Sequence, residues 1–239
     1  MNNRDTVFVS EQGDLVDFAF DDRVARVFPD MIRRSVPGYD TVISLLGVVA
    51  EKYWQTGTAV VDIGCSLGAA TLAMHHRLGE RPLKYVCIDN STAMIERCQQ
   101  QLGGLMPEAC IEYRCEDAAD CGVEGASVVV MNFTLQFLPV QKRQNLVNRI
   151  HRQIATGGVL ILSEKLNYGP DVPFDLLHDA FKSANGYSQL EISQKRSALE
   201  NVMRIDSAET HRKRLQSAGF RKTIQWFQTL NFSSFLAVK

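Results

Sequence analysis

Apolar side chains near the start of the chain follow a helical spacing. Between residues 23 and 34 they recur at intervals of three and four, which places them on one face of a helix. A loop with Pro and Gly follows at 35–39, and a second helix is expected from about 41 to 53. Pro29 lies inside the first helix and could kink it. Residues 1–56 are therefore predicted to form a helical cap.

After Gly57 the pattern changes to short apolar, β-branched runs that alternate with amphipathic stretches. Such runs are typical of buried strands, and their alternation with helices predicts a parallel sheet with right-handed crossovers. Strands are predicted at 59–63, 83–88, 111–114, 127–131 and 159–162, and helices at 69–78, after the cap residue Ser91, and at 140–154.

Residues 165–205 break this alternation, and we expect this helical insertion to cover an active site. The elements predicted from here onward are helices at 174–184 and 190–203, a helix between Ser207 and Gly219, and strands at 223–227 and 232–238. A short link joins the two closing strands, so they are expected to pair in antiparallel fashion.

The composition fits one domain. The chain has 239 residues, and 45% of them are hydrophobic, which is enough for one sizeable α/β core. The formal net charge is −1, whereas proteins that bind nucleic acid by themselves usually carry a basic excess. We therefore expect no direct nucleic-acid binding, and we interpret the eight Lys and Arg residues in 195–222 as a solvated helix face. Without a recognisable signal peptide or membrane span, a cytoplasmic location is predicted.

Cysteine and histidine positions predict no metal site. The six cysteines form no CxxC pair, and the five histidines do not complete a zinc pattern. Cys65, Cys87 and Cys98 fall inside apolar periodic runs, and we interpret them as small core residues. His75 and His76 are adjacent on a predicted helix and are expected to face different ways.

Two glycines lie at the turn between the first predicted strand and its helix, in the pattern Asp62-x-Gly64-x-x-x-Gly68. Glycine at such a turn lets the backbone approach a ligand closely. Asp89 ends the second predicted strand, 21 residues after Gly68, where a carboxylate can accept both hydroxyls of an adenosine ribose. These two features alone do not separate a dinucleotide from S-adenosylmethionine.

Residue types at four consecutive strand ends favour S-adenosylmethionine. Asp62 stands where dinucleotide folds place apolar residues, and its pattern resembles motif I of the class I S-adenosylmethionine methyltransferases. Asp117 follows the third predicted strand, where that superfamily contacts the adenine amino group. Asn132 ends the fourth, beside the expected methionine moiety.

The predicted fold is therefore a Rossmann-like class I methyltransferase fold of the α/β class. We expect a mostly parallel seven-stranded sheet with an antiparallel last strand, built as a single domain over residues 1–239. Its expected parts are the N-terminal helical cap (1–56), a cofactor-binding half (57–164), the helical insertion (165–205), and a C-terminal helix with the strand pair (206–239).

Several segments carry a more specific likeness. They are FPDMI (28–32), RSVPGY (34–39), GCSLGAAT (64–71), MIERC (94–98), NFTLQFL (132–138), LSEK (162–165) and EISQKRS (191–197). Together they resemble the carboxy-S-adenosyl-L-methionine synthase family (CmoA), and the likeness covers nearly the whole chain. The departures, in 102–107 and around Asp120, touch no position to which we assign chemistry.

This resemblance implies an enzyme that converts S-adenosylmethionine and prephenate to carboxy-S-adenosylmethionine and phenylpyruvate. It implies no protein nucleophile, because prephenate would supply both the base and the carbon dioxide that a sulfonium ylide captures. The protein would then act by positioning and charge complementarity. The resemblance also implies a homodimer, and a separate enzyme that uses the product to carboxymethylate wobble uridine in tRNA.

The ligand contacts that the resemblance implies are Tyr39, Gly64, Cys65, Ser66, Asp89, Asn90, Asp117, Ala118, Asn132 and Arg196. Arg196 also has a physical argument, because the carboxylate added beside the sulfonium needs a fixed cation and a guanidinium can bind both oxygens. Lys165 and His178 are candidates for the prephenate carboxylates, with a structural role as the alternative.

Two other functions stay open at this point. The first is an ordinary small-molecule methyltransferase, in which Arg196 would hold a substrate acid. The second is a non-catalytic module that binds S-adenosylmethionine and recruits a tRNA-modifying enzyme.

Overall fold

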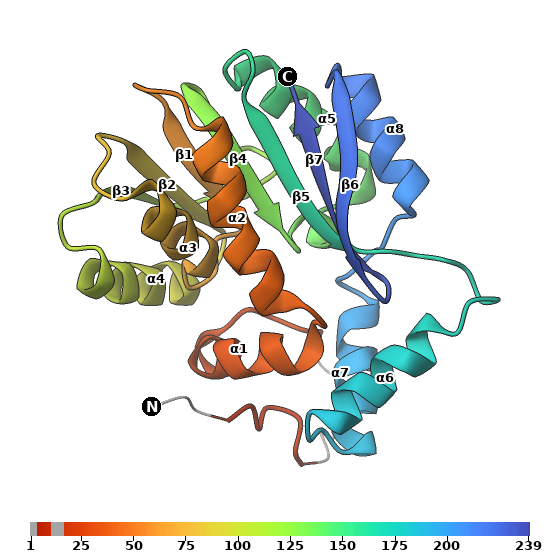
Figure 1. Ribbon diagram of the computed structural model, residues 1–239. Helices are drawn as coiled ribbons and strands as arrows, with labels where there is room; N and C mark the ends of the chain where they lie inside the picture. Colours follow the sequence, from red (N-terminus) through yellow and green to blue (C-terminus); the bar gives the residue numbers. More distant parts are fainter. Residues whose placement is uncertain (1–3, 11–16) are drawn as a thin grey trace.

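The computed structural model describes residues 4–10 and 17–239. Its centre is a seven-stranded sheet with the order β3-β2-β1-β4-β5-β7-β6 (Figure 1). The strands are β1 (Ala59–Ile63), β2 (Lys84–Asp89), β3 (Cys110–Cys115), β4 (Ala126–Asn132), β5 (Val159–Lys165), β6 (Lys222–Thr229) and β7 (Phe232–Val238). Strands β1 to β5 pair in parallel, and β7 runs antiparallel to both β5 and β6. The sheet predicted from the sequence is confirmed.

The helices also follow the predicted order, with small differences at their ends. They are α1 (Asp22–Ser35), α2 (Tyr39–Tyr53), α3 (Ala69–Leu78), α4 (Thr92–Leu105), α5 (Val140–Gln153), α6 (Phe174–Ala184), α7 (Gln189–Glu200) and α8 (Ala208–Ala218). A short 3-10 helix, η1 (Leu135–Phe137), was not expected from the apolar pattern. Helix α1 runs continuously past Pro29 and begins with the Asp21 side chain accepting from Val24 N–H.

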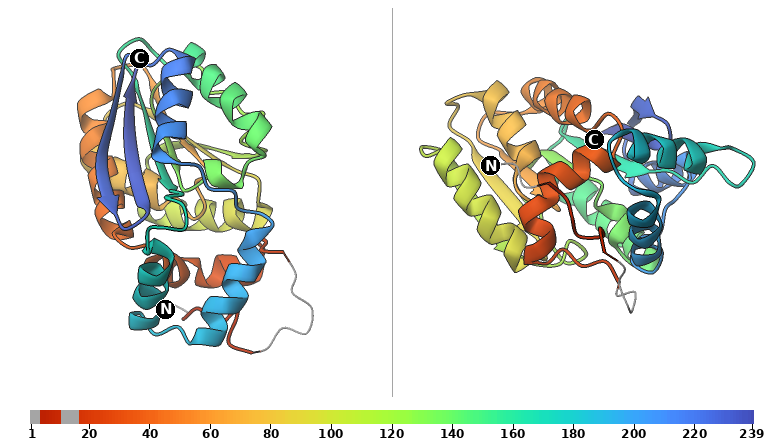
Figure 2. Two further views of the ribbon diagram at one scale, coloured as in Figure 1. Left: turned by 90° about the vertical axis from the view of Figure 1, so that its right-hand side faces the viewer. Right: turned by 90° about the horizontal axis from the view of Figure 1, so that it is seen from below.

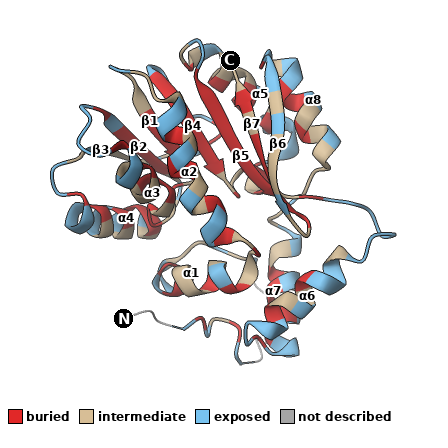
Figure 3. Ribbon diagram, viewed as in Figure 1, coloured by how far each residue is buried: buried red, intermediate tan, exposed pale blue. Residues whose placement is uncertain are grey.

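The central strands are buried on both faces, as their continuous apolar runs predict. Val60 and its neighbours on one face pack against α2, α3 and α4. Val61 and Ile63 point to the other face and join the core formed with α5 and α8. Figure 3 shows β4 and β5 buried along most of their length, whereas much of α6 is exposed.

Helices α1, α6 and α7 gather beyond the ends to which the parallel strands point (Figures 1 and 2). Hydrogen bonds tie them to the described start of the chain. Arg34 Nε on α1 donates to the carbonyl of Asn185 at 2.7 Å, and the Tyr187 hydroxyl donates to the Asp5 carboxylate. From here on we call residues 4–10 together with α1, α6 and α7 the cap. Unlike the helical cap predicted for residues 1–56, it includes α6 and α7 of the insertion and leaves out α2, which packs against the sheet.

The basic stretch 195–222 is not a uniformly solvated face. Lys195 and Arg214 are both buried. Arg214 Nη2 donates to the Asp206 carboxylate at 2.9 Å, so part of this charge stabilises the interior. The interpretation of the whole stretch as solvated is therefore wrong for these two residues.

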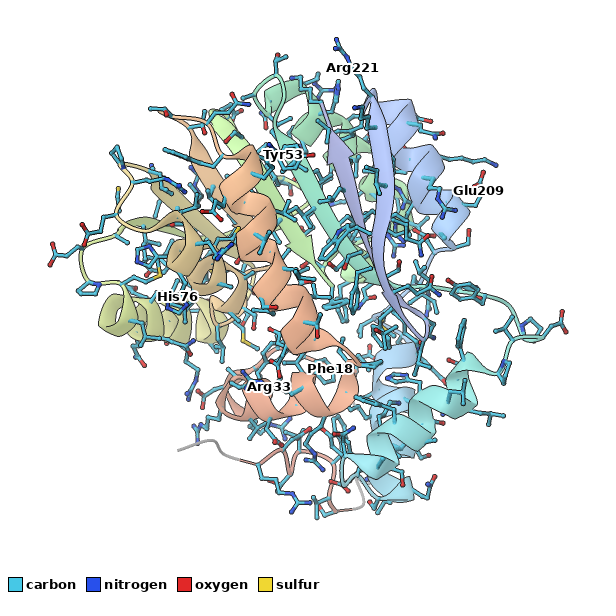
Figure 4. All side chains as sticks on the ribbon, in the orientation of Figure 1. Phe18, Arg33, Tyr53, His76, Glu209 and Arg221 are labelled. Carbon is cyan, nitrogen blue, oxygen red and sulfur yellow. The ribbon has the colours of Figure 1, made fainter. Side chains whose placement is uncertain are left out.

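Two smaller expectations concern the histidine pair and membrane segments. The His75 ring packs edge-on against Tyr85 with centroids 5.7 Å apart, while His76 is exposed on α3 (Figure 4). The two histidines therefore face different ways, as predicted. Within residues 4–10 and 17–239, no helix combines the length and the apolar character that crossing a bilayer would need.

Candidate functional site

The turn between β1 and α3 has a conformation that requires its glycines. Gly64 and Gly68 have φ angles of +73° and +81°. A Cβ on Gly64 would lie 2.1 Å from Thr134 Oγ1, and one on Gly68 would lie 2.9 Å from Cys98 Sγ. No side chain fits either position without displacing a neighbour, so the close packing of this turn requires glycine at both positions.

Asp89, at the end of β2, holds this turn through a hydrogen bond. Its Oδ2 accepts from the Ser66 N–H at 3.0 Å, and its Oδ1 accepts from the Ser91 N–H at 2.9 Å. Burial raises the pKa of Asp89, and the backbone donors oppose that rise. Each carboxylate oxygen can accept more than one hydrogen bond. The group is therefore fixed in orientation and still suited to the two hydroxyls of a ribose.

A cavity beside this turn has an aromatic wall that suits a purine ring. Phe20 and Phe137 line it with ring centroids 5.2 Å apart in an edge-to-face arrangement. Asp117 also lines the cavity, and its Oδ1 accepts from the Ala119 N–H at 2.8 Å. Sequence reasoning missed both phenylalanines, because no spacing pattern connects two residues so far apart in the chain.

Asn132 offers an acceptor at the end of β4. Its Oδ1 is buried and has no hydrogen-bond partner among the described residues. A buried acceptor without a donor carries a free-energy cost that a ligand N–H can remove. The next residue, Phe133, has a φ of +61°, a strained conformation for a non-glycine residue that is typical of functional sites. This acceptor fits the ammonium group of a methionine moiety.

Asp62 and Tyr39 are two further buried polar groups that line the cavity. Burial raises the pKa of Asp62 to about 7, although Thr71 Oγ1 donates to its carboxylate at 2.8 Å. A cationic ligand beside it would favour the ionised form. Burial also raises the pKa of the Tyr39 hydroxyl above its usual range, so the hydroxyl stays protonated.

A cavity of about 790 Å³ connects these groups to the cap. Phe18 and Arg33, labelled in Figure 4 beside α1, belong to its lining. The ten contact residues expected from the sequence all line this cavity: Tyr39, Gly64, Cys65, Ser66, Asp89, Asn90, Asp117, Ala118, Asn132 and Arg196. Lys165 and His178 line it as well.

The cap side of the cavity carries three lysines whose side chains are 8% to 14% exposed: Lys165, Lys182 and Lys195. Lys195 Nζ donates to Ser35 Oγ at 2.8 Å, and Lys182 Nζ lies 3.1 Å from Asp179 Oδ1. Loss of solvent lowers the pKa of Lys182 and of Lys195 to about 8. Sequence reasoning missed these two lysines, since each lies among other charged residues of an amphipathic helix.

His178 sits among these lysines in a neutral form. Burial, followed by the charge of Lys182, lowers the pKa of His178 to about 3. Its Nε2 lies 2.7 Å from the carbonyl oxygen of Ser35, so this nitrogen carries the proton and donates. The ring also packs edge-on against Phe232 at 5.0 Å. These contacts favour the structural role for His178 over that of an anion-binding cation.

Arg196 lies at the cavity wall with its side chain 50% exposed. Its Nη2 forms an ion pair with Asp179 Oδ2 on α6. The guanidinium therefore already has one carboxylate partner from the protein. A ligand carboxylate would share Arg196 with Asp179 or displace it.

Comparison with known proteins shows the family. A carboxy-S-adenosyl-L-methionine synthase from Cronobacter sakazakii is 50% identical over 242 residues, which cover 100% of this chain and 98% of that protein. This chain belongs to the carboxy-S-adenosyl-L-methionine synthase family. The synthase of the same name from Escherichia coli is 49% identical over 243 residues, with the same two coverages of 100% and 98%.

Broader likenesses agree with this membership. The family model described as "Methyltransferase domain" matches residues 60–158. An O-methyltransferase family protein from Burkholderia thailandensis superposes with a TM-score of 0.67 at 16% identity, covering 92% of this chain and 60% of that one. The structural likeness shows a Rossmann-like methyltransferase fold. Membership of the synthase family supports an enzyme with S-adenosylmethionine as substrate and carboxy-S-adenosylmethionine as product.

Proposed function

We propose that this chain transfers the ring carboxyl group of prephenate to the methyl group of S-adenosylmethionine. The products are carboxy-S-adenosylmethionine, phenylpyruvate and water, which balances atoms and charge. The names of the full-length relatives support the sulfonium product. The single observation that carries the donor is the group of buried cations on the cap side of the cavity.

Burying several cations close together costs free energy unless an anion binds beside them. The charges of Lys182, Lys165 and Lys195 all act on the pKa of His178, so their fields overlap in one region of the cavity. Each lysine has a protein carboxylate nearby, at 3.4 Å for Lys165, 3.1 Å for Lys182 and 3.7 Å for Lys195. Desolvation nevertheless lowers the pKa of Lys182 and of Lys195 to about 8. Prephenate carries two carboxylates, and a dianion of that kind would supply the missing negative charge.

The chain would contribute binding, orientation and exclusion of water rather than a nucleophile. Asp89 and Asn132 would fix the ribose and methionine ends of S-adenosylmethionine on the sheet side. Lys182 and Lys195 would hold the donor on the cap side, so that its carboxyl group meets the methyl group between the two walls. Arg196 would then bind the carboxylate that the reaction creates.

Isotope transfer tests this proposal. The purified protein is mixed with S-adenosylmethionine and prephenate that carries an isotopic label in its ring carboxyl group, and the products are read by mass spectrometry. We expect the label in carboxy-S-adenosylmethionine, and one molecule of phenylpyruvate for each molecule of that product. If an added acceptor is methylated and no label enters the sulfonium compound, the protein is an ordinary methyltransferase. Binding without any conversion would indicate a non-catalytic module.

Further parts of the proposal rest on the family likeness. We propose that the product supplies a tRNA uridine carboxymethyltransferase, that the chain acts as a homodimer, and that it works in the cytoplasm. The net charge of −1 supports a division of labour in which the other enzyme binds the tRNA. Light scattering on the purified protein measures the oligomeric state directly.

A further inference from the structure

Three buried thiols lie together behind the turn that follows β1. Cys65 belongs to the turn, Cys87 to β2 and Cys98 to α4, and their Sγ atoms lie within 4.8 Å of one another. All three are free, with exposed fractions of 5%, 0% and 0%. The sequence hides this thiol trio, because its members come from three separate elements and share no short spacing.

We propose that the thiol trio is a trigonal site for a soft cation of the Cu(I) class. Metal–sulfur bonds of about 2.3 Å in a trigonal arrangement place the sulfur atoms about 4 Å apart, which lies within the 4.8 Å limit on the separations of these three Sγ atoms. Zinc prefers four ligands, and among the described residues the trio has no fourth His, Cys, Asp or Glu in the same group. Thiolates alone favour Cu(I) over harder ions.

Two of the three sulfurs contact other polar groups. Cys65 Sγ donates to the Ser66 carbonyl oxygen at 3.8 Å, and Thr71 Oγ1 lies 3.4 Å from Cys87 Sγ. Each metal–sulfur bond would replace an S–H bond and release its proton to solvent, without any oxidant or reductant.

The cofactor cavity gives this site its entrance. Cys65 lines the cavity, whereas Cys87 and Cys98 are not part of its lining. A cation would therefore reach the trio past the bare backbone of Gly64 and its neighbours. S-adenosylmethionine bound at this turn would stand in that route, so we expect it to slow loading of the metal.

Copper titration tests the site. The protein carries Cys110→Ser and Cys115→Ser, because these two exposed cysteines would otherwise capture the probe. Under anaerobic conditions, Cu(I) is added as a complex with a competing chelator. Binding is followed by the sulfur-to-copper charge-transfer band and by X-ray absorption. We expect one Cu(I) per chain with three sulfur neighbours. Cys121→Ala, which removes another buried free thiol outside the trio, should leave this binding intact.

Cys87→Ala should abolish one-to-one binding while the protein still folds and binds S-adenosylmethionine, since Cys87 does not line the cavity. Should that variant melt at a much lower temperature, Cys98→Ala replaces it in the same comparison. Unchanged copper stoichiometry in these variants, or no binding against the chelator in the parent protein, would overturn the proposal. Equal loading rates with and without S-adenosylmethionine would overturn the entry route.

Discussion

Arg196 on α7 and Asp179 on α6 form an ion pair at the cap side of the cavity. The same carboxylate also lies 3.1 Å from Lys182 Nζ, so one acid serves two cations. A ligand carboxylate must therefore compete with Asp179 for Arg196. Substitutions of Arg196 or Asp179 should therefore change the affinity of the cavity for carboxylated ligands.

Arg196→Ala should separate the two sulfonium ligands. We expect nearly normal affinity for S-adenosylmethionine and a loss of ~1.5–3 kcal/mol for the carboxylated form, about 10- to 150-fold, because only the latter carries the extra carboxylate. Arg196→Lys should recover part of this loss, since an ammonium cannot match both oxygens. Calorimetric titration of both ligands measures the effect. Equal losses for the two ligands would assign Arg196 to the fold or to the amino-acid end.

Asp179→Asn should strengthen binding of carboxylated ligands. Removing the acid frees two cations from their internal partner, and we expect a gain of ~0.5–1 kcal/mol, about 2- to 5-fold. Asp175→Asn is the matched control, because Asp175 pairs with Lys165 at 3.4 Å but is 80% exposed. That control should change affinity less. Weaker binding in Asp179→Asn would instead show that Asp179 positions Arg196 for its ligand.

Asp89→Ala should weaken binding of S-adenosylmethionine by ~2–4 kcal/mol, because the ribose loses an ionised acceptor. The substitution also removes the acceptor of the Ser66 N–H, so the turn loses a constraint. Asp89→Asn keeps one oxygen and should lose less. Calorimetry gives the dissociation constants, and thermal unfolding checks that the variants are folded. An unchanged dissociation constant would contradict the ribose assignment.

Affinity for prephenate should fall as the pH rises through about 8, where Lys182 and Lys195 lose their protons. Both pKa values are lowered from 10.5 by desolvation, and a bound dianion would raise them again, so binding above pH 8 should take up protons. Titrations in buffers of different ionisation enthalpy measure that uptake. S-adenosylmethionine alone serves as the control ligand. Proton release, or an affinity for prephenate that does not change over this range, would contradict the lysine assignment.

The isolated protein should bind tRNA weakly and without sequence preference. The net charge is −1, and two of the eight Lys and Arg residues in the basic stretch, Lys195 and Arg214, are buried, so the chain lacks the basic excess that phosphate binding needs. Filter binding or fluorescence anisotropy with a tRNA measures the affinity. A sub-micromolar complex in ~150 mM salt would contradict this expectation.

The order of elements could be predicted because each strand is a short apolar run that the sheet buries on both faces. Asp89 and Asn132 could be placed as well, because the carboxyl ends of parallel strands lie at one edge of the sheet. The ends of the helices in the insertion were harder to predict. Helix α7 ends at Glu200, earlier than its apolar pattern indicates, since helix ends depend on local capping more than on periodicity.

Two of the features that sequence reasoning missed depend on contacts between separate segments. Phe20, in the segment just before α1, packs against Phe137 of η1. The Asp179–Arg196 pair requires α6 and α7 to lie side by side, which no local pattern reveals. Residue type alone indicated that Arg196 could bind a carboxylate, but not that the protein supplies one.

The hydrogen bond between Asp5 and Tyr187 joins residues that lie 182 positions apart. At synthesis rates of ~5–20 residues per second, roughly 10 to 40 s separate the appearance of these two partners on the ribosome. The Gly64 turn, Asp89 and Asn132 are all made early in that interval, whereas Lys182 comes near its end and Lys195 follows it. A growing chain can therefore meet S-adenosylmethionine before α6 and α7 exist, and the ligand can stabilise the part of the chain that is already made.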